Sequence, residues 1–106
     1  MQRIKQIDRR IAKIKRELEQ IDDMRPGSIS LQYRDAKTKS YPYHQLNWVV
    51  GAKKQSEYVS RANLDELTRQ TENYRQFRAL CTEWVALGIE RSKLSMKLER
   101  EGRRSA

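Results

Sequence analysis

The sequence predicts an α+β protein: a long antiparallel helical hairpin, packed as a coiled coil, with a small three-stranded antiparallel β element at its tip. Apolar residues recur every three or four positions near both ends of the chain and alternate with polar residues in the middle. Only 37% of the 106 residues are hydrophobic and 35% are charged, which suits helices that bury one stripe. We expect a single domain over 1–106, with a helix over 1–24, a β meander over 28–60, a second helix over 61–101 and a basic tail over 102–106.

The first helix is predicted by a heptad pattern. Its apolar side chains follow one another at steps of three and four, and few apolar residues lie elsewhere on the segment. A seam this narrow is typical of a helix that packs against another helix. The helix is expected to end before Pro26 and Gly27, because proline disfavours helical backbone in the residue before it and glycine permits a turn. The seam consists of Ile4, Ile7, Ile11, Ile14, Leu18 and Ile21.

The middle segment is predicted to form three short strands. Hydrophobic residues alternate with polar ones over 28–33, as in a half-buried strand. Residues 43–50 are rich in aromatic and β-branched side chains and predict the second strand, and residues 55–59 predict the third. A polar, basic loop over 34–40 joins the first two strands. Because so small a meander is not stable alone, we expect it to pack on the helices.

The second helix is expected to start at Ser60 or Asn63, since Asn63 and Glu66 fit a capping box. The connection returns the chain to where it left the first helix, so the two helices are expected to run antiparallel. The second helix is then longer by about 16 residues, and this overhang carries an apolar strip.

A second copy of the chain is the simplest cover for that strip, so we predict a homo-oligomer, with a dimer favoured. Binding of another protein to the overhang is the alternative. The residues expected to mediate self-association are Ile4, Ile7, Ile11, Ile14, Ile89, Leu94, Met96 and Leu98.

The formal net charge of +9 favours polyanionic partners. The excess is densest over residues 25–60, which hold six Lys and Arg against two Asp and Glu. A basic surface that only aids solubility is the plainer interpretation. No membrane partner is expected, because the sequence has no apolar run of membrane-spanning length and no apolar signal-peptide core. We expect a cytoplasmic protein.

No catalytic or cofactor-binding pattern is present, so we expect a protein that is not an enzyme. His44 is the only histidine and Cys81 the only cysteine, which is too few for a zinc site within one chain. His44 has no carboxylate or thiol near it in sequence and is expected to be a surface or half-buried ring. Cys81 is expected to be a small core residue. No glycine-rich phosphate-binding loop occurs.

Nucleic acid is the partner that the remaining polar residues favour, with duplex DNA first. Lys and Arg of the β segment would neutralise phosphates, and the polar face of the early second helix holds side chain types that read base edges. A merely solvated helix face is the alternative. Trp48 and Trp84 are expected to be structural. The candidate nucleic-acid-binding residues are Arg34, Lys37, Lys39, Lys53, Lys54, Arg69, Gln70, Asn73, Gln76 and Arg78.

Four stretches of the sequence carry a resemblance: PGSISLQY at 26–33, YPYHQLNW at 41–48, EYVS at 57–60 and NYRQFRALCTEW at 73–84. In these stretches the chain resembles an uncharacterised bacterial domain family often encoded near transposases on mobile elements. Many members of that family carry a cysteine cluster in the first loop, which implies a metal site. Here the loop over 34–40 has no cysteine, so no metal function carries over.

The leading hypothesis is a DNA-binding accessory protein of a mobile genetic element, which acts as a coiled-coil oligomer that presents basic β tips to a duplex. The first alternative is a protein–protein adaptor or inhibitor encoded by a phage or mobile element. The second is a protein that binds structured RNA with the same cations. An enzyme is the least favoured class.

Overall fold

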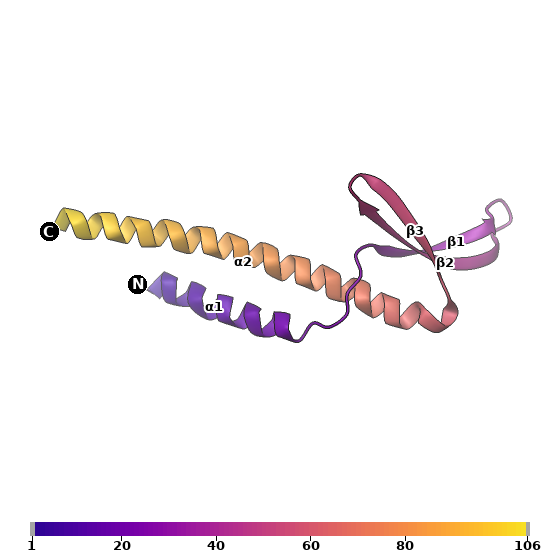
Figure 1. The fold of residues 1–106 in the computed structure, drawn as a ribbon, viewed down its shortest axis with the longest axis horizontal. Coiled ribbons are helices and arrows are strands. Elements are labelled where there is room, and N and C mark those ends of the chain that lie inside the picture. Colours follow the sequence, from indigo (N-terminus) through magenta and orange to yellow (C-terminus); the bar gives the residue numbers. More distant parts are fainter. Residues whose placement is uncertain (1, 106) are drawn as a thin grey trace. The chain divides into compact units, whose positions relative to one another are not determined.

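Figure 1 shows the fold in a computed structural model, which describes residues 2–105. Within them the chain forms α1 (Gln2–Glu19), β1 (Ser28–Asp35), β2 (Ser40–Val50), β3 (Lys53–Val59), a short 3₁₀ turn (Arg61–Asn63) and α2 (Leu64–Ser105). The chain divides into two compact units. The sheet unit comprises residues 22–76, and the helix unit comprises α1 with the part of α2 from residue 77 onward.

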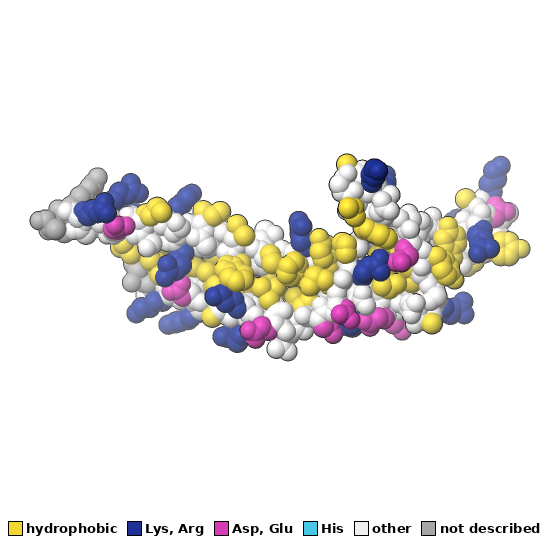
Figure 2. Space-filling view, in the orientation of Figure 1, with side chains coloured by type: hydrophobic (Ala, Val, Ile, Leu, Met, Phe, Trp, Pro, Cys, Tyr) yellow, Lys and Arg dark blue, Asp and Glu magenta, His cyan; other side chains and the backbone are white. Residues whose placement is uncertain are grey.

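In the helix unit, α1 runs antiparallel to the C-terminal part of α2. Arg3 pairs with Glu90, with 2.5 Å between Nε and Oε2, and Arg10 pairs with Glu83 at the same distance. Because a later residue of α1 meets an earlier residue of α2, the two helices point in opposite directions. Figure 2 shows apolar side chains along the seam between them, flanked by these charged residues.

A third ion pair and a ring contact hold the same two helices together. Arg91 donates from Nε to Asp8 Oδ1 at 2.6 Å. The ammonium of Lys15 lies 5.3 Å from the centre of the Trp84 ring, within the range of a cation–π interaction. Trp84 is half-buried, as expected of a structural residue.

The predicted coiled-coil hairpin is wrong. Knobs-into-holes packing would bring the backbones of the two helices close together at every turn, yet the repeated close approaches of the backbone lie between neighbouring strands and not between α1 and α2. Only Ile7 and Ile14 of the predicted seam are fully buried, and the other seam residues stay partly exposed. One row of the heptad is enclosed and the other is not. The chain is therefore an N-terminal helix, an antiparallel sheet and a long C-terminal helix.

The first helix also ends at Glu19, five residues before the expected end. The amides of Gln20 and Ile21 bond to carbonyls three residues earlier, which tightens the last turn. Carboxylates at Glu19, Asp22 and Asp23 oppose the helix dipole at this end, which gives a physical reason for the early stop. The segment that follows contains no helix up to β1.

The predicted three-stranded antiparallel sheet is confirmed, in the order β1-β2-β3. Ile29 lies opposite Leu46, and His44 lies opposite Val59, so these side chains share one face. Leu46 is fully buried and Val59 nearly so. With buried Thr71 of α2, they make up the apolar centre of the sheet unit.

The opposite face of the sheet is polar along its middle. Asn47 donates from Nδ2 to Ser30 Oγ at 2.9 Å, and Ser56 donates from Oγ to Asn47 Oδ1 at 3.2 Å. These bonds connect all three strands across the middle of the sheet. The sheet therefore has one apolar face and one face whose polar groups bond to each other.

The chain enters β1 through a tightly packed junction. Gly27 has φ +115°, and a Cβ there would lie 2.3 Å from the backbone oxygen of Asn47. The guanidinium of Arg25 lies 5.2 Å from the centre of the Trp48 ring and 2.8 Å from the Glu57 carboxylate. This packing explains why a glycine follows Pro26 and why Trp48 is structural.

Within the described residues, no helix is long and apolar enough to cross a membrane.

Candidate nucleic-acid interface

The predicted phosphate-binding cations of the sheet form two groups at its two ends. The register places the β1–β2 turn beyond the pair Asp35 and Ser40, and the β2–β3 turn beyond the pair Val50 and Lys53. Since β2 has 11 residues at about 3.3 Å each, the two turns lie up to about 33 Å apart. The first group is Arg34, Lys37 and Lys39, and the second is Lys53 and Lys54.

All five of these side chains are exposed, and the structure gives none of them an ion-pair or hydrogen-bond partner among the residues it describes. In Figure 2, Lys and Arg side chains mark both turns of the sheet. We call the two groups the turn cations. They are free to bind an anion at each end of the sheet.

The two carboxylates of the sheet strands are engaged in other contacts. Asp35 Oδ1 accepts hydrogen bonds from the backbone amides of Lys37 at 3.2 Å and Thr38 at 3.4 Å, which fixes the β1–β2 turn. Glu57 accepts from Arg25 at 2.8 Å. Neither acid neutralises a turn cation directly.

Local backbone geometry presents the turn cations to solvent. Gly51 and Ala52 both have positive φ, at 51° and 69°, as the two-residue type I′ turn requires. This turn follows the twist of the strands and leaves Lys53 and Lys54 on the first positions of β3. Lys39 and Tyr41 also have positive φ, at 53° and 59°, which bends the chain as it leaves the β1–β2 turn.

An aromatic groove of about 410 Å³ lies at the end of the sheet nearer the β1–β2 turn. The rings of Tyr43 and Tyr58 approach each other there, with 6.4 Å between ring centres and 35° between ring planes. Tyr58 is 66% exposed, so one side of this pair is open to solvent. The groove is lined by Leu31, Tyr33, Pro42, Tyr43, His44, Tyr58, Val59, Arg61 and Leu64.

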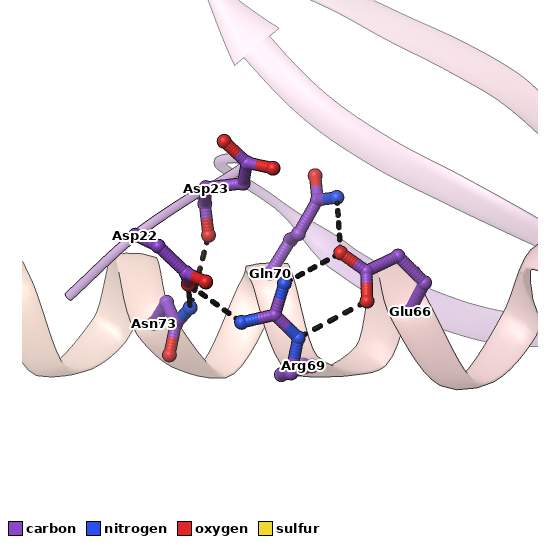
Figure 3. Close-up of polar contacts among 6 residues, drawn as sticks. All are labelled: Asp22, Asp23, Glu66, Arg69, Gln70 and Asn73. Carbon is purple, nitrogen blue, oxygen red and sulfur yellow. Dashed lines mark hydrogen bonds and ion pairs between the residues drawn. The ribbon is translucent and has the colours of Figure 1, made fainter.

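Three of the polar α2 residues expected to read bases are engaged within the chain. Figure 3 shows Arg69 between two acids: it donates from Nη1 to Asp22 Oδ1 and from Nη2 to Glu66 Oε1, both at 2.6 Å. Gln70 donates from Nε2 to the same Glu66 oxygen at 2.9 Å. These groups would have to break these bonds to reach a base.

Asn73 completes this network from the next turn of α2. Its Nδ2 donates to Asp22 Oδ1 and to the backbone oxygen of Asp23, both at 2.9 Å. Carboxylates thus lie directly beside the face that was expected to approach a phosphate backbone. Gln76 and Arg78 are exposed, and Arg78 belongs to the helix unit.

The network changes the protonation of its acids. Hydrogen bonds from Arg69 and then from Gln70 lower the pKa of Glu66 from 4.5 to about 2. The hydrogen bond from Arg69 also lowers the pKa of Asp22, and the same two acids raise the pKa of Arg69. All three groups therefore stay charged at neutral pH and stay paired.

The residues predicted for self-association fall into three classes. Ile7 and Ile14 are fully buried within the single chain, so they are occupied. Ile89 and Met96 are more than half exposed, and so is Val85, which was not among the predicted residues. The remaining members are partly buried: Ile4, Ile11, Leu94 and Leu98.

The groove was not predicted from the sequence, nor were three of its polar or aromatic residues, Tyr43, Tyr58 and Arg61. A signal for Tyr58 was present, since it alternates with buried Val59 and so lies on the other side of β3. His44 lines the groove, and Cys81 lies half-buried on α2. The described residues hold no group of three His, Cys, Asp or Glu that could bind a metal ion.

Comparison with known proteins gives one match. Neither a curated protein nor a solved structure matches the chain. The family described as "Domain of unknown function (DUF6788)" matches residues 4–69, which include most of α1, the whole sheet and the start of α2. The match confirms the predicted resemblance to an uncharacterised domain family. Because it covers more than half of the 106 residues, the protein belongs to the DUF6788 family.

Proposed function

We propose that the protein binds nucleic acid without catalysing a reaction, and that the turn cations carry the binding. The observation that supports this most directly is five exposed cations without partners among the described residues, at two ends of one sheet whose acids are engaged in other contacts. The proposal includes an accessory role in a bacterial mobile element, in the cytoplasm. Resemblance to a family encoded near transposases favours that role.

The spacing of the two groups favours an extended polyanion over a small anion. A single phosphate cannot reach both ends of a sheet that are up to about 33 Å apart. A nucleic-acid backbone carries charges at short, regular intervals and can contact both groups at once. These cations alone suit DNA and RNA equally, because phosphate contacts carry no sequence information.

The polar face of early α2 has no part in this proposal. Arg69, Gln70 and Asn73 already bond to Glu66, Asp22 and the backbone of Asp23. A phosphate that approached this face would meet those carboxylates. Binding through the sheet turns avoids this repulsion.

A gel-shift with duplex DNA, single-stranded DNA and RNA at two salt concentrations tests the proposal. The parent should bind at low salt and weaken as salt rises. Lys37→Ala with Lys39→Ala should weaken binding, and so should Lys53→Ala with Lys54→Ala. No affinity of the parent for any of the three probes would contradict the proposal.

The matched control for both pairs is Lys93→Ala with Lys97→Ala. These two lysines of α2 are exposed, and their replacement removes the same charge from the helix unit. The control should bind like the parent, apart from a small effect of total charge. Equal weakening by all three pairs would mean that only net charge matters.

Protein–protein contact is the second candidate function. Val85, Ile89 and Met96 are 63%, 53% and 59% exposed and form a strip on one side of α2. A contiguous apolar strip in water favours a protein partner. A second copy of this chain is the simplest such partner.

A further inference from the structure

We infer that the aromatic groove of the sheet takes an unpaired base of single-stranded nucleic acid, with Tyr58 as the stacking platform. The inference rests on the proposed function and names its substrate class. The structural basis is the groove at the open end of the sheet, where exposed rings lie beside free cations.

The groove exists because the strands differ in length. β3 pairs with β2 only from His44 to Val50, whereas β1 pairs with β2 as far as Ser40. Residues 40–43 of β2 therefore have a neighbouring strand on one side only. The vacant edge, closed below by Arg61 and Leu64, forms the groove.

Tyr58 offers a ring that is both held and open. Its contact with Tyr43, at 6.4 Å between ring centres, positions the ring without covering it. It remains 66% exposed although it belongs to a strand, so its apolar face stays in contact with water. Stacking on a base would remove that face from water, and every base has a suitable π surface.

The volume of the groove and its lining suit a base. A space of about 410 Å³ falls within the range of small-ligand pockets. Leu31, Pro42, Val59 and Leu64 give it apolar walls, and the ring nitrogens of His44 can bond to a base edge. The lining is therefore mostly apolar and aromatic, with few polar groups.

Charge complementarity identifies the occupant as part of a polyanion. Arg61 lines the groove, is exposed and has no ion-pair partner among the described residues. The β1–β2 hairpin extends past the groove and carries Arg34, Lys37 and Lys39. A base on Tyr58 would place its flanking phosphates near these cations.

Stacking on a tyrosine selects single strands. The bases of a duplex already stack on each other, so their faces are not accessible to a side chain. An unpaired base exposes its face at no such cost. The groove would therefore favour single-stranded over duplex probes, in contrast to the cations alone.

Fluorescence anisotropy tests the inference with labelled single-stranded DNA, an abasic strand of equal length and a duplex. The abasic strand keeps the phosphates but has nothing to stack. The parent should bind the base-bearing strand most tightly. Tyr58→Ala should lower that affinity by about fivefold or more, as expected when one stacking interaction is removed, and leave the affinity for the abasic strand unchanged.

Two further variants keep the test decisive. Tyr58→Trp, which offers a larger ring, should bind the base-bearing strand at least as tightly as the parent. Tyr41→Ala is the matched control, because Tyr41 is 73% exposed on the same sheet but does not line the groove. It should leave both affinities as in the parent.

Three results would overturn the inference. Tyr58→Ala could weaken binding to both strands equally, which would assign the ring to folding or to phosphate contact. It could change neither, as expected if the groove takes an apolar peptide. Tyr41→Ala could match its effect. In all three cases the parent still binds nucleic acid, so the proposed function survives, whereas a parent that binds no probe refutes both.

Discussion

Arg69 of α2 bonds to Asp22, which lies 47 residues earlier in the chain, with 2.6 Å between Nη1 and Oδ1. This ion pair links the segment after α1 to the first turns of α2 within the sheet unit. It also places a carboxylate on the helix face whose residue types predicted base reading. The pair is therefore a structural contact on a face that was expected to bind DNA.

Asn73→Ala should leave sequence preference unchanged. The Asn73 amide already bonds to Asp22 and to the backbone oxygen of Asp23, so its removal should loosen this segment instead. The expected result is a lower melting temperature by circular dichroism and the same ranking of DNA sequences in a competition gel-shift. A changed ranking at an unchanged melting temperature would restore base reading to this face.

Stability should fall as the pH drops from about 5 towards 2. In the unfolded chain Glu66 takes up a proton near its ordinary pKa of 4.5, whereas in the folded protein hydrogen bonds from Arg69 and Gln70 hold its pKa at about 2. The unfolded state therefore binds more protons in this window, and acid favours it. Salt should reduce the effect because the pair is half-exposed.

Thermal melts at several pH values measure this effect in the parent and in Glu66→Gln. The variant should show a shallower decrease in melting temperature between pH 5 and 2, as about one linked proton is removed. Glu72→Gln is the matched control, because Glu72 is exposed on α2 and has no partner among the described residues. Equal slopes for the parent and Glu66→Gln would contradict the role of the network.

Alanine at two glycines should have opposite effects. Gly27→Ala should be strongly destabilising, since φ is +115° and the new Cβ would lie 2.3 Å from the Asn47 oxygen. Gly88→Ala should stabilise by about 0.5–1 kcal/mol, because Gly88 lies within α2 with nothing within 4 Å of the new Cβ. Chemical denaturation measures both, and a neutral Gly27→Ala would contradict the packing of this junction.

Self-association, if it occurs, should use the exposed strip of α2. Ile89→Glu with Met96→Glu should convert a dimer to a monomer in light scattering at tens of micromolar, about the range in which weak dimers are visible. Ser95→Glu is the control, because Ser95 is exposed but lies off the strip. A parent that stays monomeric in this range would contradict the prediction.

Much of the fold could be predicted because it depends on local periodicity. Alternation over β1 and β2 and the helical spacing over α2 appear directly in the sequence, and the structure has those elements. The coiled coil could not be excluded in this way, since a heptad pattern also fits a helix that buries only one of its two rows. Ile7 and Ile14 form that buried row.

The candidate site was only partly predictable, for a related reason. The turn cations lie next to glycine and polar turn signals, so local sequence is enough to expose them. The partners of Arg69 and Asn73 come from the segment after α1, and the groove depends on how far β3 pairs along β2. Neither relation is encoded in residue spacing.

Measuring nucleic-acid affinity as a function of salt concentration tests the central claim most directly. Removing one phosphate contact should reduce the slope of log affinity against log salt by about 0.9 on duplex DNA and about 0.7 on a single strand. Lys53→Ala with Lys54→Ala should therefore flatten the slope by about one to two units. Lys93→Ala with Lys97→Ala should leave it as in the parent, and identical slopes for all three proteins would contradict binding through the turn cations.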